Sequence, residues 1–395
     1  MKYLNDIPNI MPYACHSSNT RGRFYIDENL VLGRSEYQRD RDRIIHSEAF
    51  RRLKDKTQVF VYHSGDHFRT RLTHTIEVSQ IARSIAKSLK INEDLTETLA
   101  LAHDLGHPPL GHKGEEVLKN LMKNYNGFDH NQQSLRIVTF LEKKYPNFDG
   151  LNLTFETLEG LIKHNGPYLD LQYIPCELQK ILKKFSLELK KYPSLEAQVA
   201  NISDDIAYLT HDFDDGLREK LFTINDLQCV ELVNLIILDI KKMYTNIEDD
   251  ILVHQLIRRL VSYFINDIIS NSSQIITQNN FRTVEDIRNH NDNVIKLSQK
   301  ARSNMEEIRS FLFKNMYHNK IILDKLSKYS VMIEKLFYLF QENISFLPYQ
   351  WRNFKGHSLY TSTAAKQARV ITDYIAGMSD NFLRKQYIKF FKEEI

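Results

Sequence analysis

Leu101-Ala-His103-Asp104-Leu-Gly-His107-Pro-Pro-Leu-Gly-His112 is the stretch from which both the fold and the chemistry of this chain are best inferred. Apolar residues at helical spacing precede it, so His103 and Asp104 are expected in the last turn of a helix that the glycine and prolines then end. Adjacent side chains on a helix point about 100° apart. If the His-Asp pair binds one metal ion, further ligands must therefore come from other helices.

The composition is that of an ordinary soluble protein. The chain has 395 residues, of which 42% are hydrophobic and 26% charged, and its formal charge is +3. This length allows one large domain or two. Its three cysteines, Cys15, Cys176 and Cys229, form no metal motif. With neither a signal-peptide pattern nor an apolar run of about 20 residues, we expect a cytoplasmic protein without a membrane span.

Basic residues are concentrated between positions 34 and 56, where eight arginines and lysines face five acids: Arg34, Arg39, Arg41, Arg43, Arg51, Arg52, Lys54 and Lys56. Two interpretations of this stretch stay open. It is either a solvated helix face with internal ion pairs or a surface that binds anions.

Helical periodicity dominates the chain, which predicts an all-α fold. The exception is a short β-hairpin near residues 57–73, where β-rich segments flank Ser64-Gly65-Asp66. One charged amphipathic helix is expected over 35–56, with Ile44, Ile45, Phe50 and Leu53 as its apolar face, and the Asn-rich segment 270–280 is expected to form a loop. Further helices are expected over 74–89, 95–104, 115–122, 131–144, 154–164, 176–192, 195–210 and 364–382.

Four segments follow as the expected domain organisation: an irregular N-terminal arm (1–33), a catalytic helical core (34–216), a helical appendage without a readable motif (217–345) and a C-terminal helical segment that packs on the core (346–395). The role of the appendage is open, with assembly or regulation as the expectation.

Eight of the fifteen histidines lie between residues 63 and 164: His63, His67, His74, His103, His107, His112, His130 and His164. His74 begins one predicted helix, the His-Asp pair ends the next, and Asp204 lies on a third. Two imidazoles and two carboxylates form a mixed nitrogen and oxygen site that suits Mn²⁺, Mg²⁺, Fe²⁺, Co²⁺ or Ni²⁺. An ion with open positions polarises a phosphoryl oxygen or activates water, which is the chemistry of a hydrolase.

The order His74, His103-Asp104, Asp204 resembles the signature of the HD-domain metal-dependent phosphohydrolases. Longer strings resemble one branch, the dGTPase-like deoxynucleoside triphosphate triphosphohydrolases, densely over residues 30–216 and again over 360–390. These strings are Arg34–His46, Phe50–Phe60, Phe68–His74, Ala102–His112, Glu156–Gly160 with Lys163–Gly166, Ser203–Tyr208 and Asp373–Asp380.

The resemblance implies roles for individual residues. Those that match the metal ligands are His74, His103, Asp104 and Asp204. Asp204 is preferred over Asp205 because the family's carboxylate lies four residues before a tyrosine, here Tyr208. His112 and Glu115 match the catalytic pair, in which imidazole moves protons and the carboxylate orients it. His130 matches a further catalytic histidine, although Asn131 stands where the family often has an acid.

The substrate-binding positions implied by the resemblance are Gln58, Arg71, His107, Tyr208 and Asp212. Gln58 matches the residue that binds the sugar 3′-hydroxyl, and Tyr208 with Asp212 matches the sugar platform that excludes a 2′-hydroxyl. Arg71 and His107 match groups that face the phosphates, where guanidinium binds in a bidentate manner. Simpler interpretations remain: Tyr208 as core, Gln58 as a hairpin residue and Arg71 as an ion pair with Glu77.

The resemblance implies hydrolysis of a deoxynucleoside triphosphate to the deoxynucleoside and tripolyphosphate, with one divalent ion per site. It also implies a homo-oligomer such as a hexamer, and allows single-stranded DNA or an allosteric nucleotide as a partner. One alternative is an HD-domain nucleotidase or phosphodiesterase, which the sugar-reading residues disfavour. Another is a nucleic-acid-responsive regulator that binds through residues 34–56 or the lysine pairs at 183–184 and 190–191.

Overall fold

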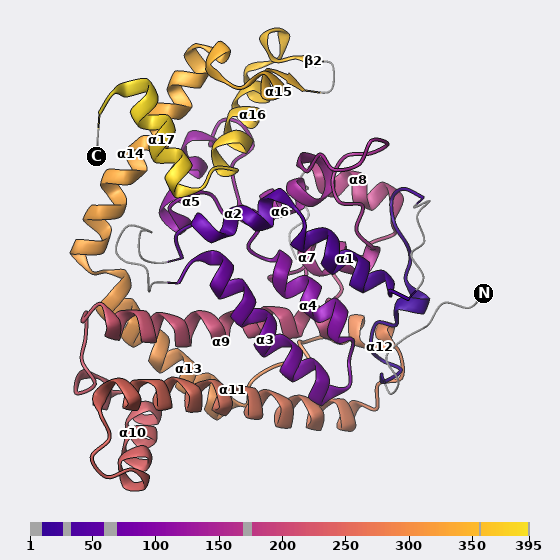
Figure 1. The fold of residues 1–395 in the computed structure, drawn as a ribbon. Helices are drawn as coiled ribbons and strands as arrows, with labels where there is room; N and C mark the ends of the chain where they lie inside the picture. The colour runs from indigo at the N-terminus through magenta and orange to yellow at the C-terminus, as the bar shows by residue number, and fades with distance from the viewer. Residues whose placement is uncertain (1–9, 27–32, 59–68, 169–175, 355–356, 394–395) are drawn as a thin grey trace. The chain divides into compact units, whose positions relative to one another are not determined.

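The computed structural model describes residues 10–26, 33–58, 69–168, 176–354 and 357–393. Within these residues the chain forms seventeen α-helices and one pair of two-residue strands, so the predicted all-α fold is confirmed (Figure 1). Most of the predicted hairpin lies outside the described residues. Thr57 and Thr70 at its ends form one antiparallel bridge. The expected return strand is wrong over its last three residues, because a helix begins at Arg71.

Two compact units make up the fold, and each is built from segments that are far apart in the sequence. Unit 1 comprises residues 1–45, 74–103 and 151–319, whereas unit 2 comprises residues 46–73, 104–150 and 320–395. The boundary after residue 103 separates His103 from Asp104, so the His-Asp pair contributes one residue to each unit. The four consecutive domains expected from the sequence stay a prediction.

The helices that carry the histidines of unit 1 surround one core. α4 packs against α1, α7 and α9, and it buries Leu95 and Leu99. Asn92, Thr154 and Ser194 cap α4, α7 and α9, each side chain accepting a bond from a backbone amide of the first turn. The helices are α1 (Glu36–Ile45), α3 (Arg71–Leu89, in this unit from His74), α4 (Glu93–Ala102), α7 (Phe155–Ile162) and α9 (Leu195–Arg218).

The rest of unit 1 is a helical layer on α9. The long helices α9 and α11 lie side by side, and α13 also packs on α9 (Figure 1). Its helices are α8 (Cys176–Lys184), α10 (Glu231–Met243), α11 (Asp249–Asn279), α12 (Val284–Arg288) and α13 (Gln299–Leu312). Helix α8 ends at Lys184, so the helix expected over 176–192 is too long.

The loop expected over 270–280 is wrong, because α11 continues to Asn279. A buried residue recurs every four positions along α11 from Leu252 to Ile276. Its polar side chains at this point are used in packing: Ser272 accepts a bond from the amide of Lys296, and Asn271 donates to the carbonyl of Lys296. The polar side chains of Asn271 and Ser272 therefore make tertiary contacts from within a helix and do not form a turn.

Unit 2 has its own hydrophobic core. Helix α14 packs on α5, α16 and α17, and the cluster includes Leu118, Phe337, Ile371 and Leu383. The elements of this unit are α2 (Glu48–Arg52), α5 (Gly111–Leu121), α6 (His130–Arg136), α14 (Lys320–Glu342), α15 (Tyr349–Arg352), β1 (Asn353–Phe354), β2 (His357–Ser358), α16 (Ala364–Ala376) and α17 (Asp380–Phe391).

Two expected helices are each interrupted. The helix predicted over 35–56 is split at residues 46–47, because Ser47 caps a new helix by accepting from the amide of Phe50. Ile45 is consequently 37% exposed and is not part of an apolar face. The helix expected over 364–382 stops at Ala376, and Ser379 caps α17 by accepting from Phe382.

The residues between α4 and α5 form a tight connection, as the sequence indicated. α4 ends at Ala102 and His103 is its C-cap, so the helix stops just before the His-Asp pair that was expected in its last turn. Gly106 has no room for a side chain, since a Cβ there would lie 2.1 Å from the carbonyl oxygen of His130 and 2.3 Å from the amide nitrogen of Ser134. Its own amide donates to Ser134 Oγ at 2.9 Å. Glycine is therefore required at this position.

Two buried charged groups hold the segments around this connection in unit 2. Lys56 Nζ donates to the carbonyl oxygens of His107 and Ala376 at 2.5 and 3.0 Å. Burial, reinforced by Arg52, lowers the pKa of Lys56 to about 7. Asp380 accepts from the amides of Thr57 and Leu110 at 2.8 and 2.9 Å. These contacts tie residues 56–57 to the connection that carries His107.

The basic stretch is largely neutralised in the described structure. Arg34 pairs with Asp42, Arg39 with Glu36, Arg41 with Asp94 and Glu97, and Arg52 with Glu48. These contacts favour the ion-pair interpretation over an anion-binding face. In the described part of the chain, no helix combines the length and the apolarity needed to cross a bilayer.

The carboxylate of Asp373 in α16 supplies a pH-dependent part of the stability. Burial acts to raise the pKa of Asp373, but Arg136 and Arg369 outweigh it and hold that pKa below its ordinary value. The stabilisation is therefore complete above the pKa that Asp373 has in the unfolded chain, about 4. It is lost as the pH falls through the lower pKa that Asp373 has in the folded protein. Asp373→Asn leaves two guanidiniums without their carboxylate, and we expect a loss of about 3–5 kcal/mol at pH 7.

Urea unfolding followed by circular dichroism, from pH 7 down to pH 3, measures this loss. The difference between wild type and Asp373→Asn is expected to shrink below about pH 4. Asp149→Asn is the control, because its pair with Lys143 is partly exposed and is worth at most about 1 kcal/mol. A difference for Asp373→Asn that does not vary with pH would contradict this account.

Candidate active site

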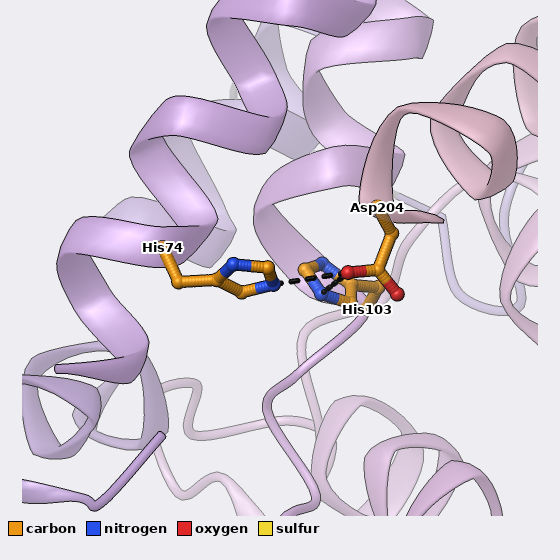
Figure 2. A group of neighbouring side chains, drawn as sticks. All are labelled: His74, His103 and Asp204. Carbon is orange, nitrogen blue, oxygen red and sulfur yellow. Dashed lines mark hydrogen bonds and ion pairs between the residues drawn. The ribbon is translucent and has the colours of Figure 1, made fainter. Parts of the chain in front are cut away.

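Three side chains from three helices of unit 1 converge on one point: His74 in the first turns of α3, His103 at the end of α4 and Asp204 in α9 (Figure 2). His74 Nε2 lies 2.9 Å and His103 Nε2 3.5 Å from the same Asp204 oxygen, Oδ1. One ligand atom from each residue lies within 4.8 Å of the others. This is the grouping that the sequence predicted for these three residues.

The two imidazoles are oriented by contacts behind them. His103 Nδ1 lies 2.7 Å from the carbonyl oxygen of Ala100, so Nδ1 carries a proton and Nε2 is the nitrogen that faces Asp204. His74 Nδ1 lies 3.4 Å from His211 Nδ1, and His211 Nε2 lies 3.2 Å from Glu77. Partners of this kind set the tautomer of metal-binding histidines.

Asp204 is held as a carboxylate. Burial acts to raise the pKa of Asp204, but His103, His164 and His74 outweigh it and keep that pKa well below its ordinary value. His74 and His103 are 1% and 5% exposed, whereas the Asp204 side chain is 28% exposed. Two buried imidazoles that converge on an ionised, partly exposed carboxylate form a donor set that fits a divalent ion.

His164 and His211 are the residues of this group to which the sequence assigned no role. His164 Nε2 lies 3.8 Å from Asp204 Oδ2. His211 follows Asp204 by seven residues, which is two helical turns, so the spacing alone places both on one face of α9. That spacing was the available signal for His211. His164 lies in the turn that follows α7, and only the tertiary fold brings it to Asp204.

Asp104, the fourth predicted ligand, belongs to unit 2. There its carboxylate accepts from Arg71 Nη1 at 2.9 Å, and its second oxygen lies 2.9 Å from His107 Nδ1. Arg71, expected at the phosphates, is 2% exposed. The roles of Asp104 as a metal ligand and of Arg71 as a phosphate contact stay predictions.

Glu115 organises the predicted catalytic residues of unit 2. Its Oε1 lies 2.8 Å from His130 Nδ1 and also accepts from the His130 amide, while its Oε2 lies 3.6 Å from His112 Nδ1. Burial acts to raise the pKa of Glu115, but its bonds to His112 and His130 outweigh it and lower that pKa far below the ordinary value. The His112 side chain is 64% exposed, so it is accessible to a substrate.

His107 completes this cluster of imidazoles. Its ring lies 3.9 Å from the His130 ring and 5.5 Å from the His112 ring, measured between centroids. It is 4% exposed, and burial together with Arg71 and His130 lowers the pKa of His107 well below its ordinary value. His107 is therefore a neutral imidazole.

Gln58 and Arg71, both predicted to contact substrate, lie beside Gly111 at the start of α5. A Cβ on Gly111 would lie 3.2 Å from Arg71 Nη2 and 3.4 Å from the Gln58 carbonyl oxygen. Gln58 is 7% exposed, and its side-chain oxygen has no hydrogen-bond partner within the described residues. A buried amide oxygen without a partner is costly and is available to a ligand hydroxyl.

Tyr208 and Asp212 share a face of α9 with Asp204, as their spacing predicted, and a third residue joins them. The ring of Tyr317 stacks on that of Tyr208 with centroids 6.0 Å apart, and its hydroxyl donates to Asp212 Oδ2. Burial and Asp212 raise the pKa of Tyr317, so its hydroxyl stays protonated. Tyr317 lies in the segment for which the sequence provided no motif.

Asp205, the neighbour of Asp204, faces a different environment. It pairs with Arg309 at 3.2 Å and lines a pocket of ≈ 200 Å³ that also includes His164, Lys163 and Arg302. Burial and the charge of Asp204 raise the pKa of Asp205 to about 6. The Asp204 carboxylate therefore lies between the two imidazoles, whereas the Asp205 carboxylate lies on the wall of this pocket.

Comparison with known proteins agrees with this geometry. The family model described as the HD domain matches residues 71–209, and that of a phosphohydrolase-associated domain matches residues 295–389. Among curated proteins, a deoxyguanosinetriphosphate triphosphohydrolase-like protein of Jannaschia sp. is 46% identical and covers 94% of this chain and 92% of its own length. Proteins of the same name from Bradyrhizobium sp. and Bartonella quintana are 44% and 42% identical, each over 96% of this chain and over 96% and 94% of their own lengths.

A helical fold in which the histidine of a His-Asp pair meets a histidine and an aspartate from two other helices is typical of an HD-domain phosphohydrolase. HD domains bind divalent metal ions, which agrees with the donor set formed by His74, His103 and Asp204. The chain belongs to the family of deoxyguanosinetriphosphate triphosphohydrolase-like proteins.

Asp204→Asn is expected to weaken binding of Mn²⁺ by roughly tenfold or more, because even residues that only support a metal ligand cost 10–100-fold when changed. Asp205→Asn is the matched control, since it removes an equal charge from the next residue and is expected to bind Mn²⁺ about as tightly as wild type. Isothermal titration calorimetry measures both. Equal weakening by the two variants would show that only the local charge matters and that Asp204 is not a ligand.

Proposed function

We propose that this protein is a metal-dependent hydrolase that converts a deoxynucleoside triphosphate to the deoxynucleoside and tripolyphosphate. The observation that carries the proposal is the convergence of His74, His103 and Asp204 in a chain whose relatives bear a triphosphohydrolase name. That name makes dGTP the first nucleotide to test among the four.

His74, His103 and Asp204, with Asp104 as the expected fourth ligand, would hold the ion. A bound divalent ion supplies Lewis-acid stabilisation of charge on a phosphoryl oxygen and lowers the pKa of water. The protein's own contribution is to fix the ligands before the ion arrives: Ala100 holds the tautomer of His103, and the imidazoles keep Asp204 ionised. Little reorganisation is then needed on binding.

His112 and Glu115 are the proposed proton-transfer pair. Glu115 is ionised and faces His112 Nδ1, so it orients the imidazole and stabilises the imidazolium that forms when His112 takes a proton. Water attacks the α-phosphorus, the bond from that phosphorus to the 5′ oxygen breaks, and the 5′ oxygen leaves with a proton as the deoxynucleoside hydroxyl. His130 supports Glu115 through two hydrogen bonds.

The sugar platform favours a deoxyribose substrate. Tyr208 is held against Tyr317, which in turn is fixed by Asp212, so the aromatic surface on α9 is rigid. A rigid ring against C2′ leaves no room for a 2′-hydroxyl. Gln58, whose buried side-chain oxygen has no partner within the described residues, would accept the 3′-hydroxyl.

Cationic side chains suit a triphosphate. Arg71 and His107 are the expected phosphate contacts, and Arg302 lines the pocket that includes His164. Guanidinium groups bind phosphate oxygens with charge-assisted hydrogen bonds. A nucleotidase acting on monophosphates needs fewer such groups, which is why we favour the triphosphate over that alternative.

A nucleic-acid-responsive regulator is the less favoured function, because Arg34, Arg39 and Arg41 of the basic stretch are already paired with acids. A homo-oligomer and a single-stranded DNA or nucleotide activator are part of the proposal as the family resemblance implies them, and both stay predictions.

Incubation of the protein with Mn²⁺ and each dNTP, followed by anion-exchange separation, tests the proposal. We expect tripolyphosphate and deoxynucleoside in equal amounts, and a loss of roughly 10²–10⁴-fold in His112→Ala, the usual contribution of a general acid or base. His46→Ala is the control, since His46 is exposed and outside both histidine groups. Release of pyrophosphate or orthophosphate, or no product with any dNTP even when single-stranded DNA is added, would contradict the proposal.

A further inference from the structure

A second group of metal-binding side chains lies entirely within unit 2 and shares no residue with the His74, His103 and Asp204 group. It consists of His107, His112 and Glu115, whose ligand atoms all lie within 4.8 Å of one another. His112 and Glu115 are three residues apart on α5, which places them on one face of the helix. His107 reaches the same point from the connection before α5.

His107 has the local arrangement of a metal-binding histidine. It is 4% exposed, and its Nε2 has no hydrogen-bond partner within the described residues. Its Nδ1 lies 2.9 Å from an Asp104 oxygen, although not in the alignment of a regular hydrogen bond. A carboxylate behind one nitrogen, with the other nitrogen free, is the pattern in which zinc-binding histidines occur. A buried nitrogen without a partner is otherwise costly.

Glu115 belongs to two overlapping groups of metal-binding side chains, and the contacts of its two oxygens show which group is better suited to an ion. Glu115 Oε1 is taken by the amide and Nδ1 of His130, whereas Oε2 faces His112. The overlapping group formed by Glu115, Asp129 and His130 is weaker, because Asp129 already caps α6 by accepting from Gln132 and His130 Nδ1 is bonded to Glu115. Oε2 is therefore the oxygen available to an ion.

We propose that His107, His112 and Glu115 bind a second divalent ion of the borderline-soft class, such as Zn²⁺, and that this ion inhibits the protein. Two imidazoles and one glutamate form the donor set of open zinc sites in hydrolases, and such a set favours Zn²⁺ or Co²⁺ over Mg²⁺, which prefers oxygen ligands. The exposed ring of His112 provides the entry path for the ion.

Inhibition follows if the proposed function is correct, and this part of the inference rests on it. An ion bound to His112 and Glu115 occupies the lone pairs that would accept and orient the proton. The same residues thus serve either proton transfer or zinc binding. A rise in free Zn²⁺ converts the active form into the zinc-bound, inhibited form.

Counting bound Zn²⁺ by equilibrium dialysis of the full-length protein without nucleotide tests the site independently of any activity. We expect two ions per chain in wild type, one in His112→Gln, one in Asp204→Asn and none in the double variant. His112 is exposed, so its substitution spares the fold. His46→Gln, which changes another exposed histidine of unit 2, is the matched control and should still bind two. A single ion in wild type, or two ions retained in His112→Gln, would overturn the second site.

The inhibitory effect has its own measurement. With Mn²⁺ and dNTP present, Zn²⁺ is expected to reduce hydrolysis at least tenfold over the concentration range in which the second ion binds. Hydrolysis that is unchanged when two ions are bound would overturn the inhibition and leave the site standing. If no dNTP is hydrolysed under any condition, the proposed function fails, and the ion count still decides the site.

Discussion

The carboxylate of Asp204, held between the imidazoles of His74 and His103, is the interaction on which the account of unit 1 depends (Figure 2). Each residue comes from a different helix, so the group exists only when α3, α4 and α9 are packed. An ionised carboxylate at a partly buried point is costly unless positive charge or a cation compensates it. This requirement links the packing of three helices to the binding of a metal ion. The contacts of Ala100 and His211 orient the two imidazoles toward the carboxylate.

Much of this arrangement was predictable from periodicity and spacing. Asp204, Tyr208 and Asp212 recur every four residues, and α9 does place them on one face. The helix that leads to His103 and the break that follows were also predictable, because apolar residues at helical spacing precede Gly106 and the prolines. The structure adds the reason for the glycine, since a Cβ on Gly106 would collide with the backbone of residues 130 and 134. The family resemblance added the pairing of His74 with Asp204, which no local pattern contains.

The remainder depended on tertiary contacts that leave no local trace. The polar residues of 270–280 indicate a loop by composition, but Asn271 and Ser272 use their side chains to bind Lys296 within a continuous helix. Ser47 interrupts a charged pattern that otherwise reads as one helix, since a cap can override periodicity. Tyr317 comes from a segment without a motif, and His164 lies in a matching string that assigned it no role; both join the site only through folding. The hairpin residues 59–68 lie outside the described part of the chain.

The central claim is that water attacks the α-phosphorus and that the whole triphosphate leaves the sugar. Hydrolysis of dGTP in ¹⁸O-labelled water, followed by mass spectrometry of both products, tests it directly. The account predicts one labelled oxygen in tripolyphosphate and none in deoxyguanosine, because the 5′ oxygen stays with the sugar. Label in the deoxyguanosine would show attack at carbon, and label in orthophosphate or pyrophosphate would show cleavage at another phosphorus; either result would contradict the account.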